Sequence, residues 1–187
     1  MFSSKQWIIL IQIAVGTSFA FSARYLFKEN FLSFFSFPPD LSDGERFKFA
    51  FRCLALSAVP LFAAVGKVGK ARFSNMDTLG ADPTAPVAPS QKTFRIAERI
   101  LQNTLEQTVL HVLTILALAS SVDVDQLYLI PCMVLIFCFG RLAFFVGYDY
   151  DPLYRGVGFA TTWIPTVLGF SFALFTISSR AFDHQMK

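Results

Sequence analysis

Residues 98–111 read ERILQNTLEQTVLH, and the apolar run that begins within them continues to Ala119. A helix over this stretch places Arg99, Asn103 and Glu106 on one face, because each residue advances about 100° around the helix axis. We therefore interpret the stretch as the polar first half of a membrane-crossing helix. Polar groups inside a bilayer are costly, so this face is expected to turn toward protein or a water-filled pocket and to belong to a functional site.

The rest of the chain is apolar enough to surround such a helix with others. Its 187 residues are 54% hydrophobic and 16% aromatic, more apolar than a soluble domain requires. Five apolar runs have the length of about 17–25 residues that crosses a bilayer core as a helix. They are Trp7–Phe27, Phe49–Gly66, Phe94–Ala119, Leu127–Gly147 and Gly158–Ser178. The sequence predicts an all-α, single-domain integral membrane bundle with five transmembrane helices.

Several classes of function are disfavoured by composition. The net charge of +3 is spread over the loops, without the basic aromatic face that would suggest nucleic acid. The three cysteines, Cys53, Cys132 and Cys138, lie in predicted spans without a spacing motif, so neither disulfides nor a metal site is expected. The two histidines, His111 and His184, have no carboxylate at metal-binding spacing. His111 lies off the Arg99 face and is predicted to pack or hydrogen bond between helices.

The first apolar run, Trp7–Phe27, allows two interpretations. Lys5 precedes it and small residues lie near Ala23, as in a signal peptide. Its length, and the second hydrophobic run that follows it, favour a span that stays in the protein.

Two connections have unusual compositions. The Phe-rich segment Phe31–Phe37 is too short to cross a bilayer and is expected either at the membrane interface or in a packed loop. The segment Asp77–Ser90 carries Pro83, Pro86 and Pro89 among small residues. This spacing is compatible with an extended partner-binding segment, but a flexible connector is the favoured interpretation.

The distribution of basic residues predicts the orientation. With five spans, the N-terminus, the 67–95 loop and the 148–157 loop share one side of the membrane. Residues 67–99 contain six lysines and arginines, whereas the 120–126 turn on the other side contains none and two aspartates. Cytosolic loops carry an excess of Lys and Arg, so the first set is predicted to be cytosolic. The basic residues of the 28–48 loop weaken this difference.

The third and fourth spans are joined by a short turn, so the start of one and the end of the other lie at the same membrane face. Polar residues from the two spans and from the following loop therefore converge there. These residues are Arg99, Asn103, Glu106, Arg141, Tyr148 and Arg155. Because arginine pairs with carboxylates even in a low-dielectric site, the cluster suits a small zwitterion with several carboxylates. The alternative is that Arg99 or Arg141 pairs with Glu106 only to hold the bundle together.

Two motifs at this site resemble those of a known family. The first is Arg99-x-x-x-Asn103-x-x-Glu106, and the second is RLAFFVGY, residues 141–148, followed by Arg155. They resemble the membrane-associated proteins in eicosanoid and glutathione metabolism, the MAPEG family, over roughly Arg46–Ser178. The segments around Gly140 and Arg155 look most like a divergent member with an extra span before the family core. By this resemblance, residues 1–30 form the extra transmembrane helix and residues 31–187 the four-helix membrane domain, with a flexible loop at about residues 67–93.

The resemblance implies a homotrimer that binds glutathione between subunits on the cytosolic side. Contacts with the tripeptide would come from Arg99, Asn103, Glu106, Arg141 and Tyr148. Arg155 would lie near the thiol and stabilise the thiolate as the catalytic residue, because a neighbouring cation lowers a thiol pKa. The expected location is an endomembrane, of the ER, Golgi or lysosome, with a cytosolic N-terminus and surrounding membrane lipids.

Three departures from the family pattern concern the chemistry. Phe144 stands where glutathione-activating relatives often carry a tyrosine, and it cannot donate a hydrogen bond to sulfur. Gln107 and Leu101 replace polar or aromatic pocket residues of some relatives. The resemblance thus supports binding more strongly than turnover. Two functions stay open: a glutathione-dependent transferase, peroxidase or thiol-exchange enzyme, and a nonenzymatic regulator of membrane trafficking or receptor turnover that acts on a membrane-protein client.

Overall fold

The computed structural model describes residues 3–31, 38, 40–80, 82, 84, 86–88 and 91–185. These residues contain no strand and form five long helices. The helices are α1 (Ser4–Phe31), α2 (Asp43–Phe73), α3 (Lys92–Ser121), α4 (Leu129–Tyr150) and α5 (Gly156–Gln185). Each is long and apolar enough to cross a membrane. The predicted all-α bundle is confirmed for these residues, with five helices long and apolar enough to span a membrane.

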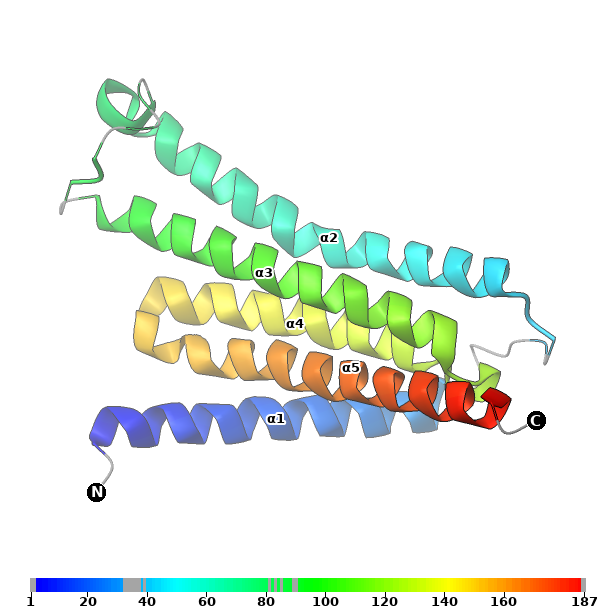
Figure 1. Cartoon of the computed structure of the whole chain (residues 1–187). Helices are drawn as coiled ribbons and strands as arrows, with labels where there is room; N and C mark the ends of the chain where they lie inside the picture. Colours follow the sequence, from blue (N-terminus) through cyan, green and yellow to red (C-terminus); the bar gives the residue numbers. More distant parts are fainter. Residues whose placement is uncertain are drawn as a thin grey trace.

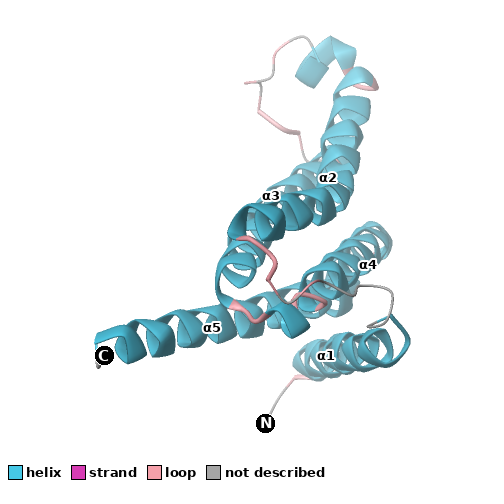
Figure 2. Ribbon diagram, turned by 90° about the vertical axis from the view of Figure 1, so that its right-hand side faces the viewer, coloured by secondary structure: helices cyan, strands magenta, loops and turns pink. Residues whose placement is uncertain are grey.

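Successive helices run in opposite directions, as Figure 1 shows. The N-terminus, the α2–α3 connection and the α4–α5 turn lie at one end of the bundle, which we call the N-terminal end. The end of α1, the start of α2, the α3–α4 turn and the end of α5 lie at the other, the C-terminal end. Helix α5 contacts α1, α3 and α4, while α2 packs on α3 and α4. Figure 2 shows that α2 and α3 lean away from α1, so the bundle is not a closed cylinder.

Helix α2 begins with a capping box and extends further than its apolar run. The backbone N–H and the hydroxyl of Ser42 both donate to the Glu45 carboxylate, at 3.1 and 2.7 Å. Pro60 lies inside the helix, which bends in its middle in Figure 1, as expected where proline removes a backbone hydrogen bond. Residues 67–73, expected in a loop, continue the helix because the basic residues of its last turn favour a helix C-terminus.

The Phe-rich segment falls largely, and the proline-containing segment partly, outside the described residues. Residues 32–37 of the Phe-rich segment lie outside them, as do residues 81, 83, 85, 89 and 90 of the proline-containing segment. In the described part of that second segment, Met76–Gly80 form one turn of π-helix.

A buried polar contact joins α2, α3 and α4 near the middle of the bundle. His111 Nε2 lies 3.1 Å from Ser57 Oγ, and its ring stacks on Phe137 with centroids 4.3 Å apart. Because a buried imidazole needs a hydrogen-bond partner, Ser57 fixes where α2 meets α3. The prediction that His111 packs and hydrogen bonds between helices is confirmed.

Glycines bring α4 and α5 into backbone contact at the N-terminal end. A Cβ atom on Gly158 of α5 would lie 2.2 Å from Phe144 N and 2.5 Å from Gly140 O, both in α4. A Cβ atom on Gly147 would lie 2.5 Å from Tyr154 O in the turn that follows. Small residues allow membrane helices to approach this closely and gain van der Waals contact. The close approach fixes the register between α4 and α5.

We expect Gly158→Ala to destabilise the protein by about 1–3 kcal/mol, the usual cost of overpacking a filled interior. Gly69→Ala is the matched control, since a Cβ atom at Gly69 in α2 would have nothing within 4 Å. That variant should be neutral or slightly stabilising, because alanine is the better helix former. Unfolding by a denaturing detergent in mixed micelles measures both changes. Equal stability of the two variants would show that α4 and α5 do not meet at Gly158.

Helix α1 is joined to the α4–α5 turn by a buried amide. Gln12 Nε2 donates to Leu153 O at 3.1 Å, and Gln12 Oε1 accepts from the N–H of Gly156 at 2.9 Å. The second bond satisfies an N–H of the first turn of α5, which has no partner within its own helix. One turn further along α1, Thr161 Oγ1 donates to Gly16 O at 3.3 Å. These contacts make α1 part of the bundle.

Replacing Gln12 by leucine should loosen the α4–α5 turn. The change leaves Leu153 O and Gly156 N–H without partners, at a cost of about 1–3 kcal/mol. Amide hydrogen exchange, measured by mass spectrometry on peptides covering residues 151–158, should become faster. Gln6→Leu, at an exposed position whose amide bonds with Ser3, should leave this exchange unchanged. Unchanged exchange in the Gln12 variant would contradict the capping role.

Candidate functional site

The centre of the site is the fully buried guanidinium of Arg141, which joins three helices. From α4, its Nη1 donates to Asn103 Oδ1 of α3 at 2.9 Å, and its Nη2 donates to Thr162 Oγ1 of α5 at 3.0 Å. Its Cζ lies 4.4 Å from the centroid of the Phe144 ring, a cation–π distance. Arg141 Nε has no hydrogen-bond partner among the described residues. The cation is therefore held by neutral groups and is not neutralised by a carboxylate.

A second cation lies further along the same side of α4. After α4, Asp151 Oδ1 accepts from Leu153 N at 2.8 Å and starts the short 3₁₀ helix η4 (Pro152–Arg155). This helix returns Arg155 toward α4, where its Nη1 donates to Tyr148 Oη at 3.3 Å. The Tyr148 ring meets the Phe144 ring edge to face, with centroids 5.4 Å apart. Arg141 and Arg155 thus lie at the two ends of a pair of packed aromatic rings.

The two remaining predicted residues, Arg99 and Glu106, lie on α3 and face away from the bundle core. Arg99 and Glu106 are exposed in the single chain, whereas Asn103 is half-buried. Glu106 Oε1 accepts from Gln102 Nε2 at 2.8 Å, along the same helix. The polar face was expected to turn toward protein or a pocket, yet within one chain only Asn103 does so. Helical periodicity shows which side chains share a face of α3, but it does not show which other helix or subunit packs against that face.

The structure thus brings four of the six predicted residues together as two pairs, Asn103 with Arg141 and Tyr148 with Arg155. Arg99 and Glu106 are exposed and join neither pair. The alternative in which an arginine pairs with Glu106 is not observed. The ion pairs among the described residues include Lys67 with Asp149 and Arg180 with Asp123. The first of them ties α2 to the end of α4 beside the site. Within one chain, these polar residues therefore do not form a buried arginine–glutamate pair that would stabilise the bundle.

Sequence reasoning missed two residues of this region, Thr162 and Thr104, and named Gln107 only as a departure from the family pattern. Thr162 holds Arg141, but a threonine inside an apolar run carries no signal of such a role. Thr104 Oγ1 and Gln107 Oε1 are buried on α3, within a turn of Asn103, and lack hydrogen-bond partners among the described residues. Buried polar atoms without partners are uncommon in stable interiors and point to a place where another group binds.

Fold and site together define a multi-pass helical membrane protein with a polar, cation-rich site at one end of the bundle. Residues 50–175, more than half of the chain, match the model of the MAPEG family. The chain belongs to this family of membrane proteins, which includes glutathione-dependent enzymes. Helix α1 lies outside the matched segment. No curated protein and no solved structure matches the chain.

We expect Asn103→Leu to destabilise the protein by about 1–3 kcal/mol, because Arg141 Nη1 would stay buried without its acceptor. Gln102→Leu is the matched control, since Gln102 is exposed and bonds with Glu106 on the same helix. It should cost less than about 0.5 kcal/mol, as exposed substitutions usually do. Detergent unfolding reports both values. A neutral Asn103 variant would show that Arg141 does not depend on α3.

Proposed function

We propose that this protein binds glutathione at a site between protomers of a homotrimer, at the N-terminal end of the bundle. The observation that carries the proposal is the outward direction of Arg99 and Glu106 on a membrane-spanning helix. Charged groups facing lipid are costly, and intramembrane charges usually face protein or water. A second copy of the chain packed against this face of α3 would cover both charges.

The donor set fits the tripeptide. Glutathione carries two carboxylates, one ammonium group and a thiol. Arg99 offers a guanidinium for a carboxylate, and Glu106 accepts from the ammonium group. Asn103 Oδ1 is already used by Arg141, so its Nδ2 is the group that can donate to the ligand. Fully buried Arg141 then acts as a positioning residue that orients Asn103 and adds positive potential.

Arg155 is the residue proposed to act on the thiol. It is exposed at the end of η4 and held on one side by Tyr148. A cation next to a thiol favours the thiolate, which is the nucleophile in conjugation, peroxide reduction and thiol exchange. Phe144 cannot supply a hydroxyl, because its side chain has none, and its ring is packed between Arg141 and Tyr148. This leaves Arg155 as the proposed source of thiolate stabilisation.

Binding is tested by calorimetry with the purified protein in detergent and glutathione as the ligand. Arg99→Gln and Glu106→Gln should each weaken binding at least tenfold, about 1.4 kcal/mol, because each removes one charge-assisted contact. The matched control is Arg180→Gln, at an exposed arginine of the C-terminal end that pairs with Asp123. Its affinity should equal that of the parent protein. Equal binding by all variants, or none by the parent, contradicts the proposal.

The role of Arg155 is tested by the pH dependence of thiolate formation in the bound tripeptide. The cation lowers the pKa of the bound thiol, so thiolate is present above that lowered pKa and is lost as the pH falls through it. In Arg155→Gln, ultraviolet absorbance of the thiolate should appear at higher pH, whereas Arg155→Lys should stay close to the parent. A pH profile that does not change in Arg155→Gln would remove this residue from the chemistry.

A second candidate function is favoured by Phe144 and by the docked α1. The motifs around Gly140 and Arg155, with a span before the family core, resemble mattrin, and this likeness suggests a nonenzymatic regulator of membrane trafficking or receptor turnover in the secretory pathway. The two functions separate in cells. If the protein is a nonenzymatic regulator, a variant that cannot bind glutathione should keep its effect on receptor turnover. If the effect depends on glutathione chemistry, the same variant should lose it. In both cases the charge of the loops favours a cytosolic N-terminal end.

A further inference from the structure

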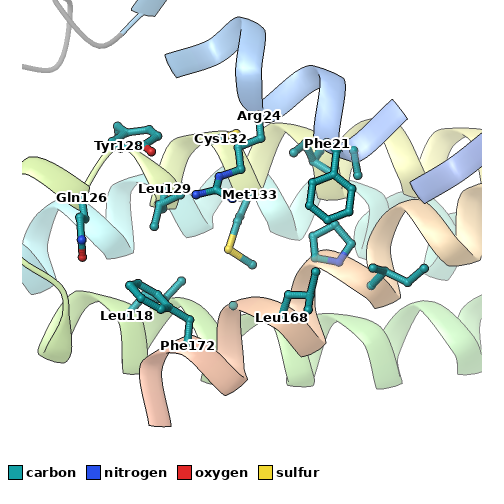
Figure 3. Close-up of a pocket in the computed structure, with 15 residues that line it drawn as sticks. Phe21, Arg24, Leu118, Gln126, Tyr128, Leu129, Cys132, Met133, Leu168 and Phe172 are labelled. Carbon is teal, nitrogen blue, oxygen red and sulfur yellow. The ribbon is translucent and has the colours of Figure 1, made fainter. Parts of the chain in front are cut away.

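A cavity of about 350 Å³ lies at the C-terminal end of the bundle, away from the six predicted site residues. Helices α1, α3, α4 and α5 line it, together with the α3–α4 turn, as Figure 3 shows. None of the six residues belongs to its lining. Because α1 lies outside the segment that matches the family, this cavity depends on a helix beyond the family core. Its function is therefore argued from its own residues.

The polarity of the cavity changes along the membrane normal. Its polar lining residues, Arg24, Gln126 and Tyr128, all lie toward the C-terminal end of the bundle. Its deeper part, toward the middle of the helices, is formed by Ile136, Ile164 and Pro165. A cavity that is polar at the membrane surface and apolar toward the midplane matches an amphiphile lying parallel to the lipids around it.

A positive charge lies at the polar end of the cavity. In Figure 3 the side chain of Arg24 leaves α1 and enters the cavity between α1 and α4. No acidic residue belongs to the lining, and among the described residues no carboxylate pairs with Arg24. Guanidinium groups bind phosphate oxygens in bidentate geometry. Gln126 and Tyr128 add further hydrogen-bond donors at the same depth.

We propose that the cavity binds one acyl chain of an anionic phospholipid from the surrounding leaflet, with its phosphate on Arg24. A volume of about 350 Å³ is at the lower end of the range for small-molecule sites and suits one chain better than two. Tyr25 and Lys28 lie in the next turn of α1 and are residues typical of the membrane interface, the depth of a phosphate group. The single guanidinium matches the single negative charge of such a lipid.

The test uses the full chain in phosphatidylcholine nanodiscs with a trace of phosphatidylglycerol that carries a diazirine midway along one acyl chain. Illumination followed by peptide mass spectrometry should place labels on α1, α4 and α5 lining segments. Leu168→Trp, at a half-exposed lining position, should fill the cavity and reduce labelling at least fivefold. Val167→Trp is the matched control, because Val167 is similarly exposed but does not line the cavity. Labelling should not change in this variant.

The recognition of the head group is tested with a second pair of variants. The parent protein should label more strongly with the phosphatidylglycerol probe than with the same probe on phosphatidylcholine, and Arg24→Gln should remove this preference. Arg52→Gln, at an exposed arginine of α2, should keep it. The proposal is overturned if no label reaches the lining residues, which is the result expected when a second copy of the chain closes the cavity. It is also overturned if Leu168→Trp is labelled as strongly as the parent protein. A free long-chain fatty acid, added at the same fraction as the phosphatidylglycerol probe, is the competitor. If it removes all labelling by the probe, the ligand is a single-chain acid and the phospholipid proposal is wrong.

Discussion

The buried guanidinium of Arg141 is the interaction on which the arrangement of α3, α4 and α5 depends. Among the residues that the structure describes, no carboxylate pairs with it, and its hydrogen bonds go to an amide on one neighbouring helix and a hydroxyl on the other. An unpaired charge in a low-dielectric interior is costly, so each of these acceptors must stay in place. The cation therefore restricts how α3 and α5 can rotate about their own axes. This restriction also determines which side of α3 carries Arg99 and Glu106 outward.

Much of the fold could be predicted from the sequence, because a bilayer requires long apolar helices with satisfied backbones. The five apolar runs identified all five helices, and His111 was recognised as an interhelical residue. The helix ends were less accurate. Apolar runs stop at Lys67, whereas the helix continues to Phe73, because lysine and arginine are good helix formers whose charges reach the membrane surface.

The site was predicted in composition but not in geometry. Motif spacing identified Arg141 and Asn103, but the partner Thr162 depends on the distance between α4 and α5, which Gly140 and Gly158 set through backbone contact. The outward direction of Arg99 follows from the packing of α3 on α2, α4 and α5, which the periodicity of one helix does not contain. The cavity near Arg24 is formed by segments distant in sequence, so no local pattern could predict it.

Helix α1 carries both Gln12, which bonds to the α4–α5 turn, and Arg24, which lines the cavity. Gln12 bonds to the turn that holds Arg155, and Arg24 lies twelve residues further on, about 18 Å along a straight helix. A change in bilayer thickness alters the tilt of a spanning helix. Any such tilt moves the Gln12 amide against the turn, so the geometry around Arg155 becomes sensitive to hydrophobic mismatch between the protein and its membrane. Through its tilt, α1 then couples the cavity at one membrane face to the Arg155 turn at the other.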